Sequence, residues 1–199
     1  MKSTVHTKPQ AEAALPQSEP VLNFRFNINK ALCSIGYILN KINTKVDFHK
    51  VFKIIYFADK RHLVEYGSPI SGDFFIAMEN GPVPSNIYDL FKEIRRNLNT
   101  DKNMFNEYFS VENRYYISLK TSPDFSHLSK SDVECLEYSI NENKDLDFSE
   151  LTDKSHDSAY KKADINNEIN FLEMAKDGGA DEKTIKYIIS ISENQAIRA

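Results

Sequence analysis

Two residues with the chemistry of a general acid–base pair, Asp59 and His62, lie three positions apart in the chain. Residues three apart on a helix are neighbours, so the carboxylate could orient the imidazole as a base. Both positions fall on the apolar face of a predicted helix, where a polar pair more often satisfies two buried groups. We therefore interpret Asp59 and His62 as a structural polar pair and keep a small hydrolase built on them as a distant alternative.

A second grouping, Ser155-His156-Asp157, contains the residue types of a catalytic triad. Known triads draw their members from separate elements, and adjacent residues rarely point at one another. A serine cap with a histidine anchoring a helix start explains the same residues. The sequence also lacks phosphate-binding, zinc-protease and nucleophile-elbow motifs. We therefore predict no enzyme activity, no catalytic residue, no cofactor and no metal site.

The element that must position Asp59 and His62 is a helix predicted over residues 48–66. Its apolar residues follow the spacing of one helical face, and further apolar residues lie off that stripe. This pattern is typical of a helix that is buried on several sides. Asp47 is predicted as the N-cap and Gly67 as the residue that ends the helix. We expect this helix to form the centre of the core.

The segment after this helix carries turn and strand signals. Residues 74–78 form a short apolar run typical of a buried strand, and Asn80-Gly81 is a tight-turn dipeptide. Two prolines then make the chain extended and stiff. Ser85 follows them and is predicted to cap a further helix.

The rest of the chain supplies the elements around this centre. An apolar seam over residues 28–42 predicts a helix packed on the central one, and Ser129 is predicted to cap another. Alternation within residues 108–119 predicts a hairpin, which we expect to form one sheet with the 74–78 strand. The predicted fold class is α+β, a mainly helical single domain around a central buried helix (about 48–66) with a small antiparallel β-sheet or hairpin.

The composition argues against several classes of protein. The chain has 199 residues, of which 41% are hydrophobic and 27% charged, as is usual for one globular domain. The net charge of −4 and the lack of a basic run predict no nucleic-acid partner. No membrane span or signal peptide is visible, so we expect a cytoplasmic protein with no membrane partner. Cys33 and Cys135 are interpreted as small apolar fillers.

The stretch YFADKRHLVEYGSPISGDFFIAMENGPVPSNIYDLFK, residues 56–92, resembles the signature of the Panacea domain, the SocA-like antitoxin domain. The typical form is roughly LLYFADxxHLxxYGRPITGDxYxAMxxGPVPSxIYDxLK, and the match is long and ungapped. The later pieces LSKSDVECLEYSI and LTDKSHDSAY are similar to the C-terminal half of the family, which includes phage-associated members. The resemblance spans about residues 28–165. Two positions depart from the pattern: Ser68, where many relatives carry a basic residue, and Tyr160, where Trp is common.

The chain divides into three predicted parts. Residues 1–22 are polar, contain three prolines and predict a disordered leader. Residues 23–165 are assigned to the Panacea-like domain. Residues 166–199 contain two predicted helices, which either pack on the domain or form an interaction arm.

The resemblance implies an antitoxin of a type II toxin–antitoxin module, which binds and neutralises a cognate toxin encoded beside it. We predict direct inhibition, because exposed aromatic residues on a stiff scaffold are good interface material. As an alternative, the founding member resembles a proteolytic adaptor that delivers its toxin to a ClpXP-type protease, and residues 1–22 would then be the tether. The sequence leaves the oligomeric state open. The predicted partner-binding residues are Tyr66, Asp73, Pro82, Ser85 and Tyr88.

Overall fold

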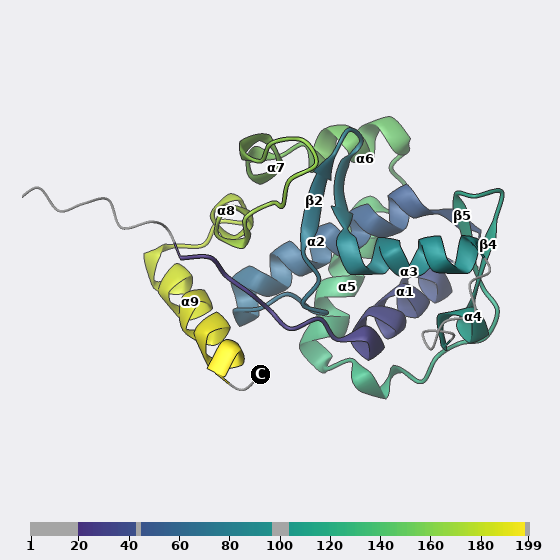
Figure 1. The fold of residues 1–199 in the computed structure, drawn as a ribbon, viewed down its shortest axis with the longest axis horizontal. Helices are drawn as coiled ribbons and strands as arrows, with labels where there is room; N and C mark the ends of the chain where they lie inside the picture. Colours follow the sequence, from purple (N-terminus) through teal and green to yellow (C-terminus); the bar gives the residue numbers. More distant parts are fainter. Residues whose placement is uncertain (1–19, 43–44, 97–103, 198–199) are drawn as a thin grey trace, which may run out of the picture.

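The computed structural model describes residues 20–42, 45–96 and 104–197, so most of the predicted leader, residues 1–19, lies outside it. The described chain is a mainly helical α+β fold with α2 running through its centre (Figure 1), and the predicted fold class is confirmed. In the described ranges the helices are α1 (Ile28–Ile42), α2 (Phe48–Tyr66), α3 (Ser85–Arg95), α4 (Met104–Tyr108), the 3-10 helix η1 (Phe125–His127), α5 (Lys130–Asn143), α6 (Phe148–Ser155), α7 (Ser158–Lys162), α8 (Phe171–Asp177) and α9 (Glu182–Ile197).

Two small antiparallel sheets accompany the helices, one in the order β1-β5-β4 and one formed by β2 and β3. The prediction that the 74–78 strand joins the 108–119 hairpin is therefore wrong. One edge of β2 pairs with β3, and residues 166–169 bond to its other edge, where the Ala77 N–H donates to the Asn167 carbonyl at 2.9 Å. Both edges are thus occupied. The strands are β1 (Val46–Asp47), β2 (Phe75–Met78), β3 (Gly81–Pro84), β4 (Phe109–Glu112) and β5 (Tyr116–Leu119).

Local capping fixes both ends of α2 at the predicted residues. The Asp47 side chain accepts the N–H of Lys50 at 2.8 Å, which satisfies one of the free donors of the first turn. Gly67 adopts a left-handed conformation with φ of 85°, and its N–H donates to the carbonyl of Leu63. A side chain at this glycine would also lie 2.6 Å from the ring of Tyr187 in α9. The predicted bounds of the central helix are confirmed.

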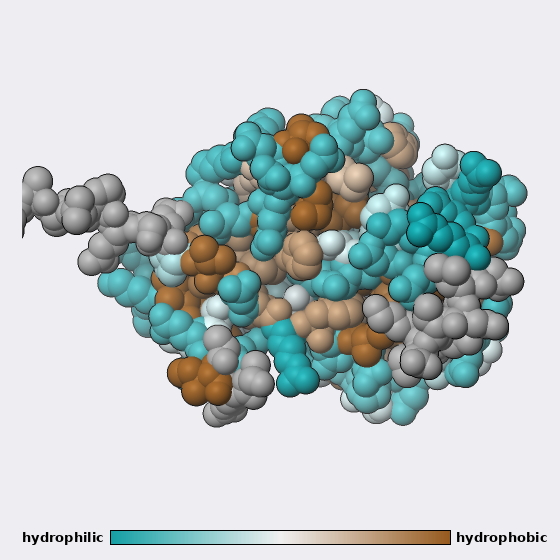
Figure 2. Space-filling model, in the orientation of Figure 1, coloured by the Kyte–Doolittle hydropathy of each residue, from teal (hydrophilic) through white to brown (hydrophobic). Residues whose placement is uncertain are grey.

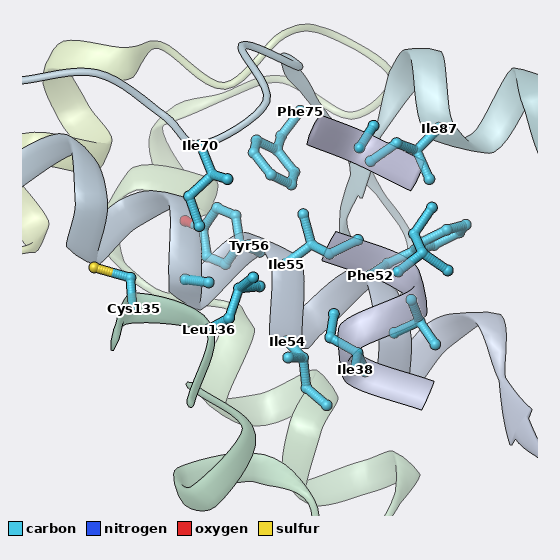
Figure 3. Packing of buried hydrophobic residues seen from close by; sticks show 14 of the residues in the cluster. Ile38, Phe52, Ile54, Ile55, Tyr56, Ile70, Phe75, Ile87, Cys135 and Leu136 are labelled. Atoms are coloured by element: carbon cyan, nitrogen blue, oxygen red, sulfur yellow. The ribbon is translucent and has the colours of Figure 1, made fainter. Parts of the chain in front are cut away.

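The core surrounds α2, because its apolar residues point in several directions. Figure 3 shows Phe52, Ile54 and Tyr56 on different sides of the helix, each among other buried hydrophobic residues. The ring of Tyr56 meets that of Phe75 in β2 at a centroid distance of 5.1 Å. Elements on every side of α2 thus bury it, as the all-round apolar pattern predicts. Cys33 and Cys135 are both buried and free.

The C-terminal helices α8 and α9 lie against the same core. Asp177 at the end of α8 forms an ion pair with Lys60 of α2 at 2.6 Å. Ser192 of α9 bonds to both the N–H and the carbonyl of Asn23, so α9 holds the N-terminal segment beside it, as Figure 1 shows. The division of the chain at residue 165 stays a prediction.

The outer surface is mostly hydrophilic. Figure 2 shows hydrophobic surface around β2 in the middle of one face and further hydrophobic patches near α9, separated by hydrophilic surface. Among the described helices, none combines the length and the apolar character that a bilayer crossing requires.

Candidate functional site

The C-terminal half of α2 contains Asp59 and His62, and each fastens the turn that follows the helix. Asp59 is 1% exposed, and its Oδ1 accepts the N–H of Ile70 at 2.9 Å. Its second oxygen, Oδ2, has no hydrogen-bond partner in the described chain, and burial raises the pKa of Asp59 to about 7. His62 Nδ1 lies 2.6 Å from the carbonyl oxygen of Ser68, so this nitrogen is the donor.

The carboxylate that meets His62 belongs to Asp132 of α5. His62 Nε2 lies 3.2 Å from Asp132 Oδ1 and forms an ion pair with it when the imidazole is protonated. Asp132 Oδ2 accepts from Lys30 Nζ at 2.7 Å and from the N–H of Ser129 at 2.8 Å. Burial alone would raise the pKa of Asp132, but the bonds from His62, Lys30 and Ser129 outweigh it and hold the pKa well below the usual range. In the described structure no hydrogen bond joins Asp59 to His62, so the contact expected along the helix is replaced by one between two helices.

Tyr66 covers this polar cluster at the surface. Its ring lies against that of His62 at a centroid distance of 4.8 Å, and its hydroxyl donates to Glu134 Oε2 at 3.3 Å. The residue is 38% exposed, so one side of the ring is accessible to a partner.

Asp73, which lies just before β2 in the chain, caps the N-terminus of α3. It is fully buried, its Oδ1 accepts the N–H of Asn86 at 3.0 Å, and its Oδ2 accepts the N–H of Ile87 at 2.9 Å. The prediction that Ser85 caps this helix is wrong, because Pro84 occupies the cap position and no side chain at that position bonds the first turn. Asp73 satisfies those donors instead. A buried carboxylate that is used in this way presents no surface to a partner protein.

The Ser155-His156-Asp157 stretch connects α6 to α7. Ser155 Oγ donates to the carbonyl of Thr152 at 3.0 Å, inside its own helix. Asp157 accepts the N–H of Tyr160 at 3.0 Å and is the cap of α7, so the predicted serine cap is wrong. The ring of His156 stacks on Tyr160 at a centroid distance of 4.2 Å. In the part of the chain that the structure describes, no hydrogen bond of these side chains joins a nucleophile to a base.

The N-terminal half of α2 borders a pocket of about 470 Å³. It lies between α2, the β2–β3 hairpin, α3, the β4–β5 turn and α6, and we name it the hairpin pocket. The rings of Phe52 and Tyr88 meet edge to face at 5.8 Å, and His49 stacks on Phe148 at 4.0 Å. Most of its wall is therefore aromatic or aliphatic. The aromatic residues that line it are Phe48, Phe52, Tyr88, Tyr115 and Phe148.

Lys53 borders the hairpin pocket and is 1% exposed. Its Nζ donates to the carbonyl oxygen of Pro82 at 2.9 Å, and in the described part of the chain no carboxylate pairs with it. Burial lowers the pKa of Lys53 to about 7. Gly81, with φ of 94°, lets the hairpin pass directly over this ammonium, since a Cβ there would lie 2.8 Å from Lys53 Nζ. The hairpin and the lysine are thus packed as one unit.

The rim of the hairpin pocket is positively charged. Arg95 at the end of α3 and Arg114 in the β4–β5 turn are exposed, and neither pairs with a carboxylate among the described residues. Glu79 is the acidic residue in the lining. Burial, followed by the charge of Lys53, lowers the pKa of His49 to about 4, so this ring is neutral at pH 7. The lining therefore combines aromatic surface with more positive than negative charge.

The structure separates the predicted contact residues into two groups. Tyr66 ends α2, whereas Tyr88 lines the hairpin pocket and Pro82 accepts the hydrogen bond from Lys53 beside it. The helix from Lys53 to Tyr66 separates the two groups by about 20 Å. Ser85 is half-buried and begins α3 one turn before Tyr88, and Pro82 is buried. Lys53 was not predicted from the sequence as a site residue. The available signal was a lysine within a helix predicted to be buried on most sides.

Residues 51–161 match the model of a protein family described as antitoxin SocA-like, Panacea domain. This stretch contains most of α2, both strands of the hairpin, and α3, α5 and α6. It therefore includes Asp59, His62 and Asp132, and nearly all of the hairpin pocket. No curated protein and no solved structure matches the chain.

Proposed function

The chain belongs to the SocA-like Panacea antitoxin family, and from this premise we propose that it is the antitoxin of a type II toxin–antitoxin module that neutralises its cognate toxin by direct binding. The observation that carries the proposal is the hairpin pocket, an aromatic-walled hollow on a rigid hairpin within the family match. Aromatic and arginine side chains around such a hollow are the residue types that dominate binding energy in protein interfaces.

We assign different roles to the predicted contact residues. Tyr88 lines the hairpin pocket and is half-buried, so its exposed edge can meet a partner without a change in the fold. Ser85 lies one helical turn away and is the second proposed contact. Pro82 and Asp73 are buried and support this surface from below. Tyr66 belongs to a separate patch, and only a toxin that spans about 20 Å would reach both.

The other two hypotheses find less support in the geometry. A hydrolase would need Asp59 to orient His62, but each of them bonds instead to the turn after α2, and His62 faces Asp132. The adaptor hypothesis depends on a tether at residues 1–22, most of which lies outside the described residues. It is therefore decided by experiment.

The test is co-expression with the product of the adjacent gene. We expect that product to be toxic alone, to be tolerated together with this chain, and to co-purify with it at a fixed ratio. Tyr88→Ala should weaken both rescue and co-purification. Tyr138→Ala is the matched control, because Tyr138 is half exposed on α5 and does not line the hairpin pocket.

Three other outcomes have distinct meanings. Rescue accompanied by disappearance of the toxin, with no stable complex, would favour the adaptor. Equal losses in Tyr88→Ala and Tyr138→Ala would remove the hairpin pocket as the contact surface. A lack of both rescue and complex formation would contradict the antitoxin proposal.

A further inference from the structure

Lys53 differs from Lys60, the other lysine at the core of the described chain, because no carboxylate among the described residues pairs with it. Asp132 is matched by Lys30 and by His62. Lys60, also largely buried, lies between Asp157 and Asp177 at 2.7 and 2.6 Å. Lys53 has one hydrogen bond, to a neutral carbonyl, although an ammonium has three hydrogens to donate. Unpaired buried charge is costly: burial lowers the pKa of Lys53 to about 7, so the amine keeps its full charge at pH 7 only when a carboxylate joins it.

We propose that the hairpin pocket receives an acidic anchor from the toxin: an Asp or Glu side chain next to an aromatic or aliphatic residue, with its carboxylate bonded to Lys53. The neighbouring apolar side chain packs against the aromatic wall that Phe52 and Tyr88 form together. This inference rests on the proposed function, since it names the chemistry of the toxin segment that the antitoxin recognises.

The size and the lining of the hairpin pocket fit such an anchor. A volume of about 470 Å³ lies in the range of ordinary ligand pockets and has room for one or two side chains. Its walls are largely aromatic, and Lys53, Arg95 and Arg114 outnumber the single acidic residue, Glu79. Carboxylate is the negative group that a protein segment offers most commonly. Apolar and ionic contacts therefore point to the same kind of occupant.

The described titratable groups around Lys53 do not supply the negative charge that the proposed anchor would supply. His49 on α2 and His156 after α6 both have their pKa lowered, first by burial and then by the charge of Lys53. Both rings are therefore neutral at pH 7 and neither add to nor cancel the positive charge. Glu79 is exposed in the hairpin turn and forms no ion pair with Lys53 in the described structure. The counter-charge is left to the partner.

The first experiment needs no toxin. Phenylacetate carries an aromatic ring and a carboxylate, and phenylacetamide is its neutral counterpart of the same shape. Titration of each into the isotope-labelled full chain is followed by NMR. We expect phenylacetate to shift resonances of Met78, Val83 and Tyr88, and phenylacetamide to bind about tenfold or more weakly. Lys53→Met should remove the preference for the acid. Equal binding of the two compounds, shifts elsewhere, or an unchanged preference in Lys53→Met would overturn the inference.

The second experiment uses the complex with the product of the adjacent gene. Lys53→Met should weaken binding about tenfold or more, whereas Lys50→Met, one turn earlier on α2 and outside the pocket lining, should not. Thermal unfolding of both variants checks that they are folded. If wild type and Lys53→Met bind equally well, the anchor is wrong and the antitoxin role stands. If the wild type binds nothing, the proposed function fails, and the phenylacetate titration still decides the chemistry of the pocket.

Discussion

The two ends of α2 handle buried charge in opposite ways. At the closed end, which comprises His62, Asp132, Lys30 and the turn held by Asp59, a carboxylate is surrounded by internal donors. At the open end, Lys53 borders the hairpin pocket and has no internal counter-charge in the described chain. Asp59 and His62, which resemble a catalytic pair in the sequence, lie at the closed end. The residue proposed to recognise a partner is an inconspicuous lysine at the open end.

The difference follows from the cost of burying charge. Removal of an ion from water costs several kcal/mol unless good partners compensate for it. At the closed end α1, α2 and the cap of α5 supply those partners to Asp132, so its charge stabilises the fold. At the open end Lys53 bonds to a carbonyl and borders the hairpin pocket, so part of the compensation is left to the proposed partner. This contrast can be broken or sharpened by four substitutions.

The largest effect is expected at the closed end, for Asp132→Ala. This change leaves Lys30 and His62 without their carboxylate and removes the capping box of α5. We expect a loss of about 3–5 kcal/mol in the free energy of unfolding at pH 7, measured with urea. Because the pKa of Asp132 is lowered, this contribution is complete above its unfolded value of 3.8 and is lost as the pH falls.

The matched control for Asp132→Ala is Glu134→Ala, which changes an exposed carboxylate on the same helix. It should alter stability by no more than about 0.5 kcal/mol. A loss below about 1 kcal/mol in Asp132→Ala would show that the closed end is not held by its ionic contacts.

Asp59 is expected to give an intermediate effect with the opposite pH dependence. Its pKa rises from 3.8 to about 7 on folding, so between these values the folded state binds more protons than the unfolded state. Stability of the wild type should therefore fall as the pH rises through this window. Asp59→Asn keeps an oxygen for the Ile70 N–H and cannot ionise, so it should be the more stable protein at pH 8, by roughly 1–3 kcal/mol.

Urea unfolding of wild type and Asp59→Asn at pH 5 and pH 8 measures this difference. Asp73→Asn serves as the comparison, because it changes another buried carboxylate. The Asp73 carboxylate bonds two N–H groups of α3, so its replacement should lower stability at both pH values. A difference between wild type and Asp59→Asn that does not change with pH would mean that Asp59 ionises normally in the fold.

Lys53→Met should have a smaller effect on stability, within about 1 kcal/mol at pH 7, because the loss of one hydrogen bond is offset by the loss of a buried charge. The pKa of Lys53 falls from 10.5 to about 7 on folding, so above pH 7 the unfolded state binds more protons. Wild-type stability should then rise relative to Lys53→Met between about pH 7 and pH 10.5. A loss as large as that of Asp132→Ala would break the contrast between the two ends.

Local signals explain why the bounds of α2 could be predicted. Asp47 and Gly67 act on the residues next to them, so both ends of the helix follow from the sequence alone. The capping box of Ser129 and Asp132 is equally local. The β4–β5 hairpin follows from alternation with a turn between its strands, in which Asn113 and Arg114 have positive φ.

The features that could not be predicted all depend on contacts between distant segments. His62 meets Asp132 from another helix, a pairing that spacing along one helix cannot reveal. The second edge of β2 is occupied by residues 166–169, about ninety positions later in the chain. The hairpin pocket exists because α3, α6 and two hairpins converge on Lys53. Residues that could act in catalysis or binding were therefore recognisable by their type. Their burial and their hydrogen-bond and ionic partners depend on tertiary packing and could not be predicted.

The smallest effect on stability is expected for Ser85→Ala. Ser85 stands where a capping serine is expected, yet Asp73 satisfies the first turn of α3, so removal of the hydroxyl should change the free energy of unfolding by less than about 0.5 kcal/mol. Thermal and urea unfolding check this value, and a loss above about 1 kcal/mol would restore the serine as the cap. Because Ser85→Ala leaves the fold unchanged, any loss of toxin binding in this variant reports the contact itself. It therefore tests the open end of α2 without disturbing the scaffold that the closed end maintains.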